Sequence, residues 1–165
     1  MVCQMMIGQM TLTFRMKIDY SNPWIYNDEP FTSADIGDYV GFVYLLTDLT
    51  NNKKYVGKKL FSSKRRLPPL KGKTRRRTKI TESDWKTYYG SSEEVQNLIE
   101  SGVQFKREIL HLCNNKGTMS YLEAKEQFDR DVLLTDEYYN GIINCKIHES
   151  HVKGLINGKQ ERDTE

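Results

Sequence analysis

The stretch VYLLTDLTNNKKYVGKK, residues 43–59, constrains the fold more than any other part of the chain. Two short apolar runs flank a polar segment with two asparagines, which tolerate turn dihedrals, so the stretch predicts an antiparallel β-hairpin. Because side chains alternate between the faces of a strand, we expect Tyr44 and Tyr55 to point outward together on one side of the hairpin. The alternative is that both are ordinary strand tyrosines packed on a sheet.

A single domain is expected from the length of 165 residues, and a hydrophobic content of 38% is low but compatible with a globular core. We expect an ordered domain over residues 36–147, with a poorly determined N-terminal extension (1–35) and a polar C-terminal tail (148–165). No apolar run reaches the roughly 18 residues of a membrane span, and the start lacks signal-peptide features. Three widely separated cysteines favour reduced thiols and a cytoplasmic location.

Positive charge is concentrated between residues 53 and 79, which include thirteen Lys and Arg and no Asp or Glu. Such a segment suits a polyanion, and nucleic acid is the usual one, because each neutralised phosphate releases a condensed counterion. The alternative is a solvated basic loop. The candidate nucleic-acid-binding residues are Lys59, Lys64, Arg66, Lys71, Lys73, Arg75, Arg76, Arg77 and Lys79.

The remaining patterns predict an α+β fold in which helices flank a small, three-stranded, mainly antiparallel sheet. Serine caps, apolar stripes at helical spacing and glycine stops mark the helices, and alternating apolar residues mark the strands. We expect a short basic helix ending before Pro68 and Pro69, because residues that precede proline disfavour helix. The further expected elements are a basic loop (66–81), a short helix around Trp85–Tyr89, a helix (92–101), a strand (103–112), a helix from Thr118 or Ser120, and a strand (141–147).

Several short motifs together resemble the GIY-YIG nuclease superfamily, including the catalytic domains of phage- or intron-type homing endonucleases. They are FVY ending at Tyr44, YVG from Tyr55 to Gly57, Arg65 ten residues after Tyr55, KEQF around Glu126, and NGIIN ending at Asn144. Many members have His or Tyr four residues after the arginine, where this chain has Pro69, and Tyr88 or Tyr89 could fill that place.

The resemblance implies a metal-dependent DNA endonuclease that hydrolyses phosphodiester bonds. Tyr44 or Tyr55 would accept a proton from the attacking water, with a slight preference for Tyr44, and Arg65 would clamp the phosphate. Glu126 would hold one Mg²⁺ or Mn²⁺. Lys58 matches a lysine of some members, and the supporting residues are Gly57, Tyr88, Tyr89 and Asn144.

Two other interpretations stay open at the level of sequence. A non-catalytic nucleic-acid-binding module could use the basic loop and stack bases on aromatic residues. A zinc site could form from Cys113, Cys145, His148 and His151, although their spacing fits only loosely. For a nuclease acting in the cytoplasm, or in the host cytoplasm if phage-encoded, specificity could come from the basic loop, a protein partner or a dimer.

Overall fold

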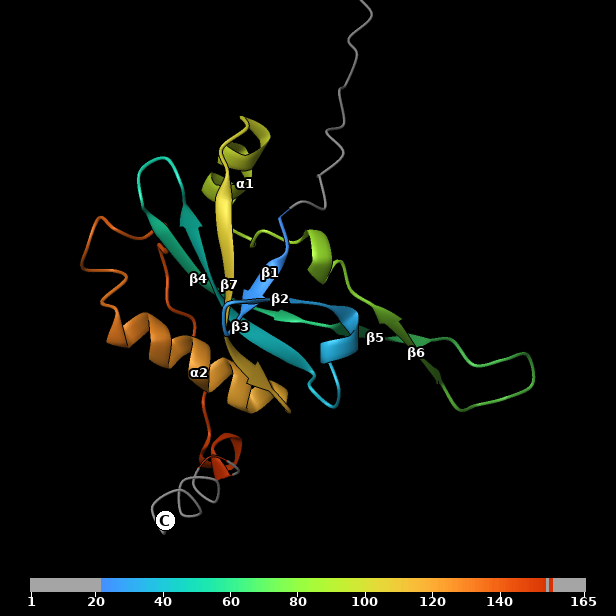
Figure 1. Cartoon of the computed structure of the whole chain (residues 1–165). Coiled ribbons are helices and arrows are strands. Elements are labelled where there is room, and N and C mark those ends of the chain that lie inside the picture. The colour runs from blue at the N-terminus through green and yellow to red at the C-terminus, as the bar shows by residue number, and fades with distance from the viewer. Residues whose placement is uncertain (1–21, 154, 156–165) are drawn as a thin grey trace, which may run out of the picture.

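The computed structural model describes residues 22–153 and 155, and its main element is a five-stranded sheet (Figure 1). The order of strands is β2-β1-β7-β3-β4. The strand bounds are β1 Trp24–Tyr26, β2 Glu29–Phe31, β3 Gly41–Asp48, β4 Lys54–Leu60 and β7 Phe105–Cys113. The α+β class is confirmed. The predicted sheet of three strands is too small, and the sheet is mixed, because β1 runs parallel to β7 while the other neighbours are antiparallel.

The hairpin β3–β4 holds the two tyrosines in the register that its alternation predicts. Tyr44 lies opposite Gly57, and Tyr55 lies opposite Leu46. Asp48 fastens the turn, because its carboxylate accepts hydrogen bonds from the Thr50 backbone N–H and, at 2.7 Å, from the Tyr139 hydroxyl. The hairpin is therefore tied both to its own turn and to the segment near the C-terminal end of the domain.

Both faces of the sheet are covered. Helix α2 (Lys116–Asp129) crosses the aliphatic face, where Val43, Leu45 and Val56 pack with Met119 (Figure 1). The opposite face packs an aromatic cluster of Trp24, Phe31, Phe42, Tyr44, Phe61 and Trp85. Tyr44 is therefore only 1% exposed, and the prediction that its ring faces outward is wrong, although it does share a face with Tyr55.

Two strands outside the main sheet form a separate arm. The strands β5 (Ser62–Leu67) and β6 (Arg77–Glu82) pair only with each other and extend away from the sheet (Figure 1, green). The predicted basic helix before Pro68 is therefore wrong, and so is the predicted loop over 66–81, of which only residues 68–76 form the tip. Lysine and arginine are good helix formers in isolation, but here they carry no apolar stripe that could pack a helix against the domain, whereas the partner strand supplies a ladder of hydrogen bonds.

The other helices and termini agree only in part with the expectations. Helix α1 (Glu93–Glu100) confirms the predicted helix at 92–101, the segment around Trp85 makes only the 3₁₀ turn η2 (Trp85–Thr87), and residues 141–147 form no strand. Short η1 (Ser33–Asp35) and η3 (Glu149–His151) complete the elements. Strands β1 and β2 lie within the expected N-terminal extension. The structure does not describe residues 1–21 of that extension, nor residues 154 and 156–165 of the expected tail. None of the described helices could cross a membrane.

Candidate active site

The two hairpin tyrosines meet at a glycine. Their ring centroids are 6.3 Å apart, and a β-carbon built on Gly57 would lie 2.4 Å from the Tyr44 hydroxyl and 3.1 Å from the Tyr55 ring. Gly90 approaches the same rings from the segment before α1, with a φ of +97° that favours glycine. Two glycines therefore make room for the pair of phenols.

Both phenols are harder to ionise than a free tyrosine. Burial raises the pKa of Tyr44 well above its ordinary value, and the neighbouring Tyr88 and Tyr55 raise it further. Burial also raises the pKa of Tyr55, an effect that Ser91 opposes and that Tyr88 and Glu123 increase. Neither Lys58 nor Arg65 lowers the pKa of these tyrosines in this structure, although a nearby positive charge would be needed to favour the phenolate form of a general base.

A polar cleft of about 340 Å³ opens beside Tyr55, between strand β4, helix α2 and the segment after Tyr139. Its volume admits a phosphate group with several waters, since each water takes about 30 Å³ in the liquid. Tyr44 does not line this cleft, because it lies behind Tyr55 in the aromatic cluster. The lining residues that matter for chemistry are Tyr55, Lys58, Glu123, Gln127, Asn140 and Asn144.

Lys58 and Glu123 form the charged centre of the cleft. The Lys58 Nζ lies 2.6 Å from the Glu123 Oε2 and also donates to the Ser120 hydroxyl at 3.2 Å. The Glu123 side chain is only 14% exposed, so its carboxylate is held against the cleft rather than solvated. Glu123 is not among the residues predicted from the sequence, although it lies one helical turn before the predicted Glu126.

Glu126 lies one turn further along α2 and contacts β7 instead of β4. Its carboxylate lies 2.6 Å from His111 Nε2 on β7 and accepts hydrogen bonds from Arg130. Burial raises the pKa of Glu126, but the contacts with His111 and Arg130 outweigh burial, and the net pKa is lowered. Glu126 does not line the cleft that Tyr55, Lys58 and Glu123 share.

The predicted arginine lies on the arm and not in the cleft. Arg65 is exposed on β5, opposite Lys79 on β6, and Pro69 lies at the exposed tip. Most of the predicted nucleic-acid-binding residues share this arm: Lys64, Arg66, Lys71, Lys73, Arg75, Arg76, Arg77 and Lys79. The structure therefore does not bring Arg65 together with the tyrosines.

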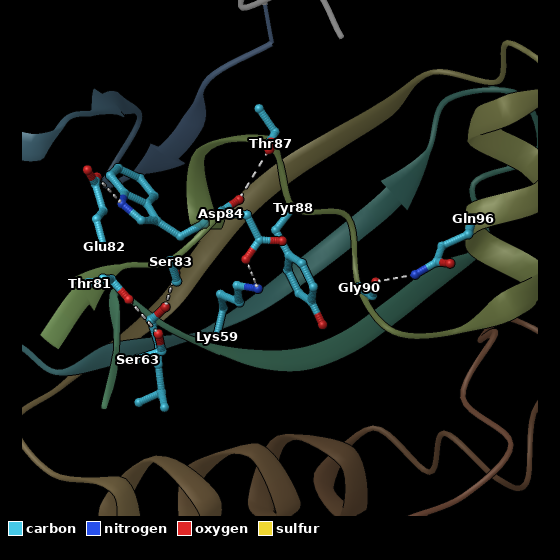
Figure 2. A network of polar contacts seen from close by, with 12 residues as sticks. Lys59, Ser63, Thr81, Glu82, Ser83, Asp84, Thr87, Tyr88, Gly90 and Gln96 are labelled. Carbon is cyan, nitrogen blue, oxygen red and sulfur yellow. Dashed lines mark hydrogen bonds and ion pairs between the residues drawn. The ribbon is translucent and has the colours of Figure 1, made fainter. Parts of the chain in front are cut away.

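Tyr88 and Lys59 connect the tyrosines to the base of the arm. Figure 2 shows the Lys59 amino group between the Asp84 carboxylate, at 2.6 Å, and the Tyr88 ring, whose centroid is 3.5 Å away. The hydrogen bond from Lys59 lowers the pKa of Asp84. The Tyr88 ring meets the Tyr44 ring edge-on at 6.1 Å, whereas Tyr89 packs against Arg107 elsewhere. Of the two candidates to replace the residue at Pro69, only Tyr88 contacts the tyrosine pair.

Both asparagines of the NGIIN motif line the cleft, although only Asn144 was predicted from the sequence as a supporting residue. Asn144 is exposed on the rim of the cleft. Asn140 is buried, and its amide exchanges two hydrogen bonds with the backbone of Val56, at 2.9 and 2.8 Å. Asn140 thus binds the edge of β4 one residue after Tyr55 and fixes the wall of the cleft.

The proposed zinc ligands do not gather. In the described part of the chain, no three or more His, Cys, Asp or Glu side chains cluster closely enough to hold a metal by themselves. Cys113 is buried, which raises its pKa to about 11, and Cys145 is exposed. Any metal bound in the cleft would therefore depend on waters and substrate oxygens for most of its ligands.

The fold and cleft can be compared with known families. Residues 24–143 match the family described as "Putative endonuclease segE, GIY-YIG domain". This match spans more than half of the chain, so the protein belongs to the GIY-YIG endonucleases and is a phosphodiester hydrolase, with DNA as the substrate that a nuclease domain implies. No curated protein and no solved structure matches the chain.

Proposed function

We propose that this protein is a metal-dependent DNA endonuclease whose reaction takes place in the cleft between β4 and α2. The observation that supports this site is the presence of Tyr55, Lys58 and Glu123 in one polar cleft, where a phosphodiester would meet an acid–base group, a cation and a carboxylate. The proposal moves the metal-ligand role from Glu126 to Glu123, because Glu126 is engaged by His111 and Arg130 outside the cleft.

The donor set of the cleft fits a hard divalent cation such as Mg²⁺ or Mn²⁺. The Glu123 carboxylate and the amide oxygen of Asn144 are oxygen ligands, and a single carboxylate suits Mg²⁺, which keeps several of its waters. When bound, the ion would neutralise charge on the phosphate and stabilise the leaving oxygen. Binding would require Lys58 to release one oxygen of Glu123 and turn toward the phosphate.

Tyr55 is the residue best placed to accept the proton of the attacking water. It lines the cleft, whereas Tyr44 is buried behind it, so the proposal favours Tyr55 over the slight sequence-based preference for Tyr44. Burial raises the pKa of Tyr55, and Tyr88 and Glu123 add to the rise, so compensating the charge of Glu123 would remove one of the effects that oppose formation of the phenolate. Tyr44 then acts through Tyr55, by holding its ring in place against Gly57.

Lys58 supplies the positive charge at the reacting phosphate. Its amino group already lies within the cleft, and an ammonium can turn from Glu123 to a non-bridging phosphate oxygen without leaving it. Arg65 takes the different role of a DNA contact on the arm, since its guanidinium is exposed there.

Cleavage assays on supercoiled, linear and branched DNA, with Mg²⁺, Mn²⁺ or chelator, test this proposal. We expect phosphodiester cleavage with either ion and none with chelator. Metal-independent cleavage by the purified protein would contradict the proposed role of Glu123. The same assays, repeated across protein concentrations, show whether a dimer or a partner is needed for specificity.

A further inference from the structure

The β5–β6 arm has no packing partner among the described residues. Every residue of β6 is exposed, and β5 is exposed over residues 63–66. A two-stranded hairpin alone is at best marginally stable in water. Its base is fixed to the domain, because Ser83 donates hydrogen bonds to the backbone oxygens of Phe61 and Leu60, but the rest of the arm projects from the sheet (Figure 1).

The register divides the arm into two faces that differ in how their charges are placed. Side chains of directly opposite residues in an antiparallel pair share a face of the hairpin. Ser63 and Thr81 are such a pair, and a hydrogen bond of 3.0 Å between their hydroxyls confirms that both side chains lie on the same face. We call this side the Arg65 face; it consists of Ser63, Arg65, Leu67, Arg77, Lys79 and Thr81. The Lys64 face consists of Ser62, Lys64, Arg66, Thr78, Ile80 and Glu82.

Only the Arg65 face sets like charges directly against each other. Arg65 lies opposite Lys79, with Arg77 one pair further out. On the Lys64 face each cation is opposite a neutral residue, Ile80 or Thr78. Directly opposed like charges destabilise a hairpin, so the Arg65 face is the side whose charges most need an anionic partner.

A continuous surface leads from the cleft to this arm. Lys58 lines both the cleft and a neighbouring groove, and that groove is also lined by Lys59, Ser62 and Ser63 at the base of the arm, together with the carboxylates of Glu82 and Asp84. Both carboxylates are neutralised within the protein, because Asp84 pairs with Lys59 at 2.6 Å and Glu82 pairs with Lys86 at 3.0 Å. A duplex whose phosphate lies at Glu123 can therefore follow Lys58 and the hydroxyls of Ser62 and Ser63 as far as β5.

The shape of the arm selects one groove of that duplex. Two strands about 4.8 Å apart, with side chains standing from both faces, are too wide for the minor groove of about 6 Å, whereas the major groove of about 12 Å admits a two-stranded ribbon. Arginine and lysine read guanine edges there, and small hydroxyls donate or accept at either base.

We propose that the β5–β6 arm enters the major groove next to the cleaved phosphate, with its Arg65 face toward the base edges and the cations of its tip on the flanking phosphates. The inference rests on the proposed function, because it uses the cleft to place the duplex. It makes the arm the element of this chain that recognises DNA sequence.

Binding of the full chain to duplex DNA, in chelator so that no cleavage occurs, tests the groove directly. Three duplexes or mixtures are compared: ordinary DNA, DNA whose cytosines carry bulky glucosyl groups that fill the major groove, and A·T-rich DNA saturated with netropsin, which fills the minor groove. We expect the glucosyl groups in the major groove to weaken binding about tenfold or more, which corresponds to the loss of at least one good contact with a base edge. Netropsin in the minor groove should change the affinity little.

Two double variants that each remove two charges from the arm isolate the face. Arg65→Ser with Lys79→Thr should weaken binding to ordinary DNA and abolish the sensitivity to filling of the major groove. Lys64→Ser with Arg66→Thr should weaken binding by a similar, salt-dependent amount and keep that sensitivity. Circular dichroism checks that both variants stay folded, as expected for exposed positions.

The inference is overturned if netropsin competes while major-groove filling has no effect, if both double variants lose the sensitivity equally, or if duplex RNA, whose major groove is too narrow for side chains, binds as well as DNA. A protein that cleaves DNA but gives one of these results refutes the groove assignment alone. A protein that passes the groove test but never cleaves refutes the proposed reaction alone.

Discussion

The Tyr44 hydroxyl lies so close to Gly57 that a β-carbon on that glycine would be 2.4 Å from it, with the ring carbon behind at 2.6 Å. No side chain can be added there without moving the tyrosine, because both residues belong to adjacent, hydrogen-bonded strands in the core. The glycine of the YVG motif is thus a requirement for space, and it links the backbone of β4 to the position of both phenols.

Substitution Gly57→Ala should therefore damage both stability and cleavage. We expect a loss of about 1–3 kcal/mol in the free energy of unfolding, typical of overpacking in a core, and a cleavage rate far below that of the parent. Urea unfolding and a plasmid assay measure the two effects. Gly141→Ala is the matched control for stability, since nothing lies within 4 Å of its added carbon. Equal unfolding curves for the two variants would contradict the packing argument.

The two glutamates of α2 should respond differently to the same change. Glu123→Gln should abolish cleavage and leave DNA binding and folding near normal, because it removes the proposed metal ligand. Glu126→Gln should lower the free energy of unfolding by about 1–2 kcal/mol, between the values for surface and buried ion pairs, and leave the folded enzyme active. A stable but inactive Glu126→Gln protein would return the ligand role to Glu126.

Acid should remove the contribution of Glu126 to stability. Its pKa is lower in the folded protein than in the unfolded chain, so its contacts with His111 and Arg130 stabilise the fold above the unfolded pKa, about 4.3. That contribution is lost as the pH falls through the folded pKa. Denaturant titrations at pH values from above about 4.3 downward should show a shallower acid decline for Glu126→Gln than for the parent.

The cleavage rate should rise with pH without a plateau in the neutral range. Burial raises the pKa of Tyr55, so the fraction of phenolate grows with pH up to and beyond the ordinary tyrosine value of about 10. Single-turnover rates at saturating Mg²⁺ measure this slope. Tyr55→Phe should lose both rate and slope, whereas Tyr44→Phe should lose some rate and keep the slope. A slope that survives in Tyr55→Phe would exclude Tyr55 as the proton acceptor.

Salt should weaken DNA binding steeply, and the tip of the arm should account for part of the slope. Replacing the tip residues Arg75 and Arg76 with Ser should flatten a plot of log affinity against log salt by about 0.9 for each phosphate that the variant no longer neutralises. The loss of affinity should be the same for unrelated DNA sequences, because these two residues are proposed to contact phosphates and not base edges. An unchanged slope would show that the tip does not bind phosphates.

The hairpin, α1, β7 and α2 could be predicted because each has a local signal: a polar turn between apolar runs, a serine before an apolar stripe, or strict alternation. The strands of the arm could not be predicted in this way. Lysine and arginine are good helix formers in isolation, and they form strands here only because β5 pairs with β6 across the tip. The parallel contact of β1 with β7 is equally non-local.

The choice between Glu123 and Glu126 shows the same limit within the site. The two glutamates are three residues apart on one helix, so the sequence pattern alone does not separate them. Which one faces the cleft depends on the rotation of α2 over the sheet, which Met119, Ala124 and Gln127 fix by their burial. Burial of that kind becomes visible only after the helix has packed.

The arm leaves the domain at Phe61 and returns at Ser83, and those two residues are hydrogen-bonded to each other through their backbones. Phe61 and Trp85 then pack edge to face at 5.3 Å and close the aromatic core beneath the junction. The two ends of the arm are therefore adjacent, and Glu82 at its base accepts a hydrogen bond from the Trp85 indole N–H at 2.9 Å. We expect that a hairpin of another length or sequence can replace residues 63–81, the part of the arm beyond that contact, and leave the aromatic core intact.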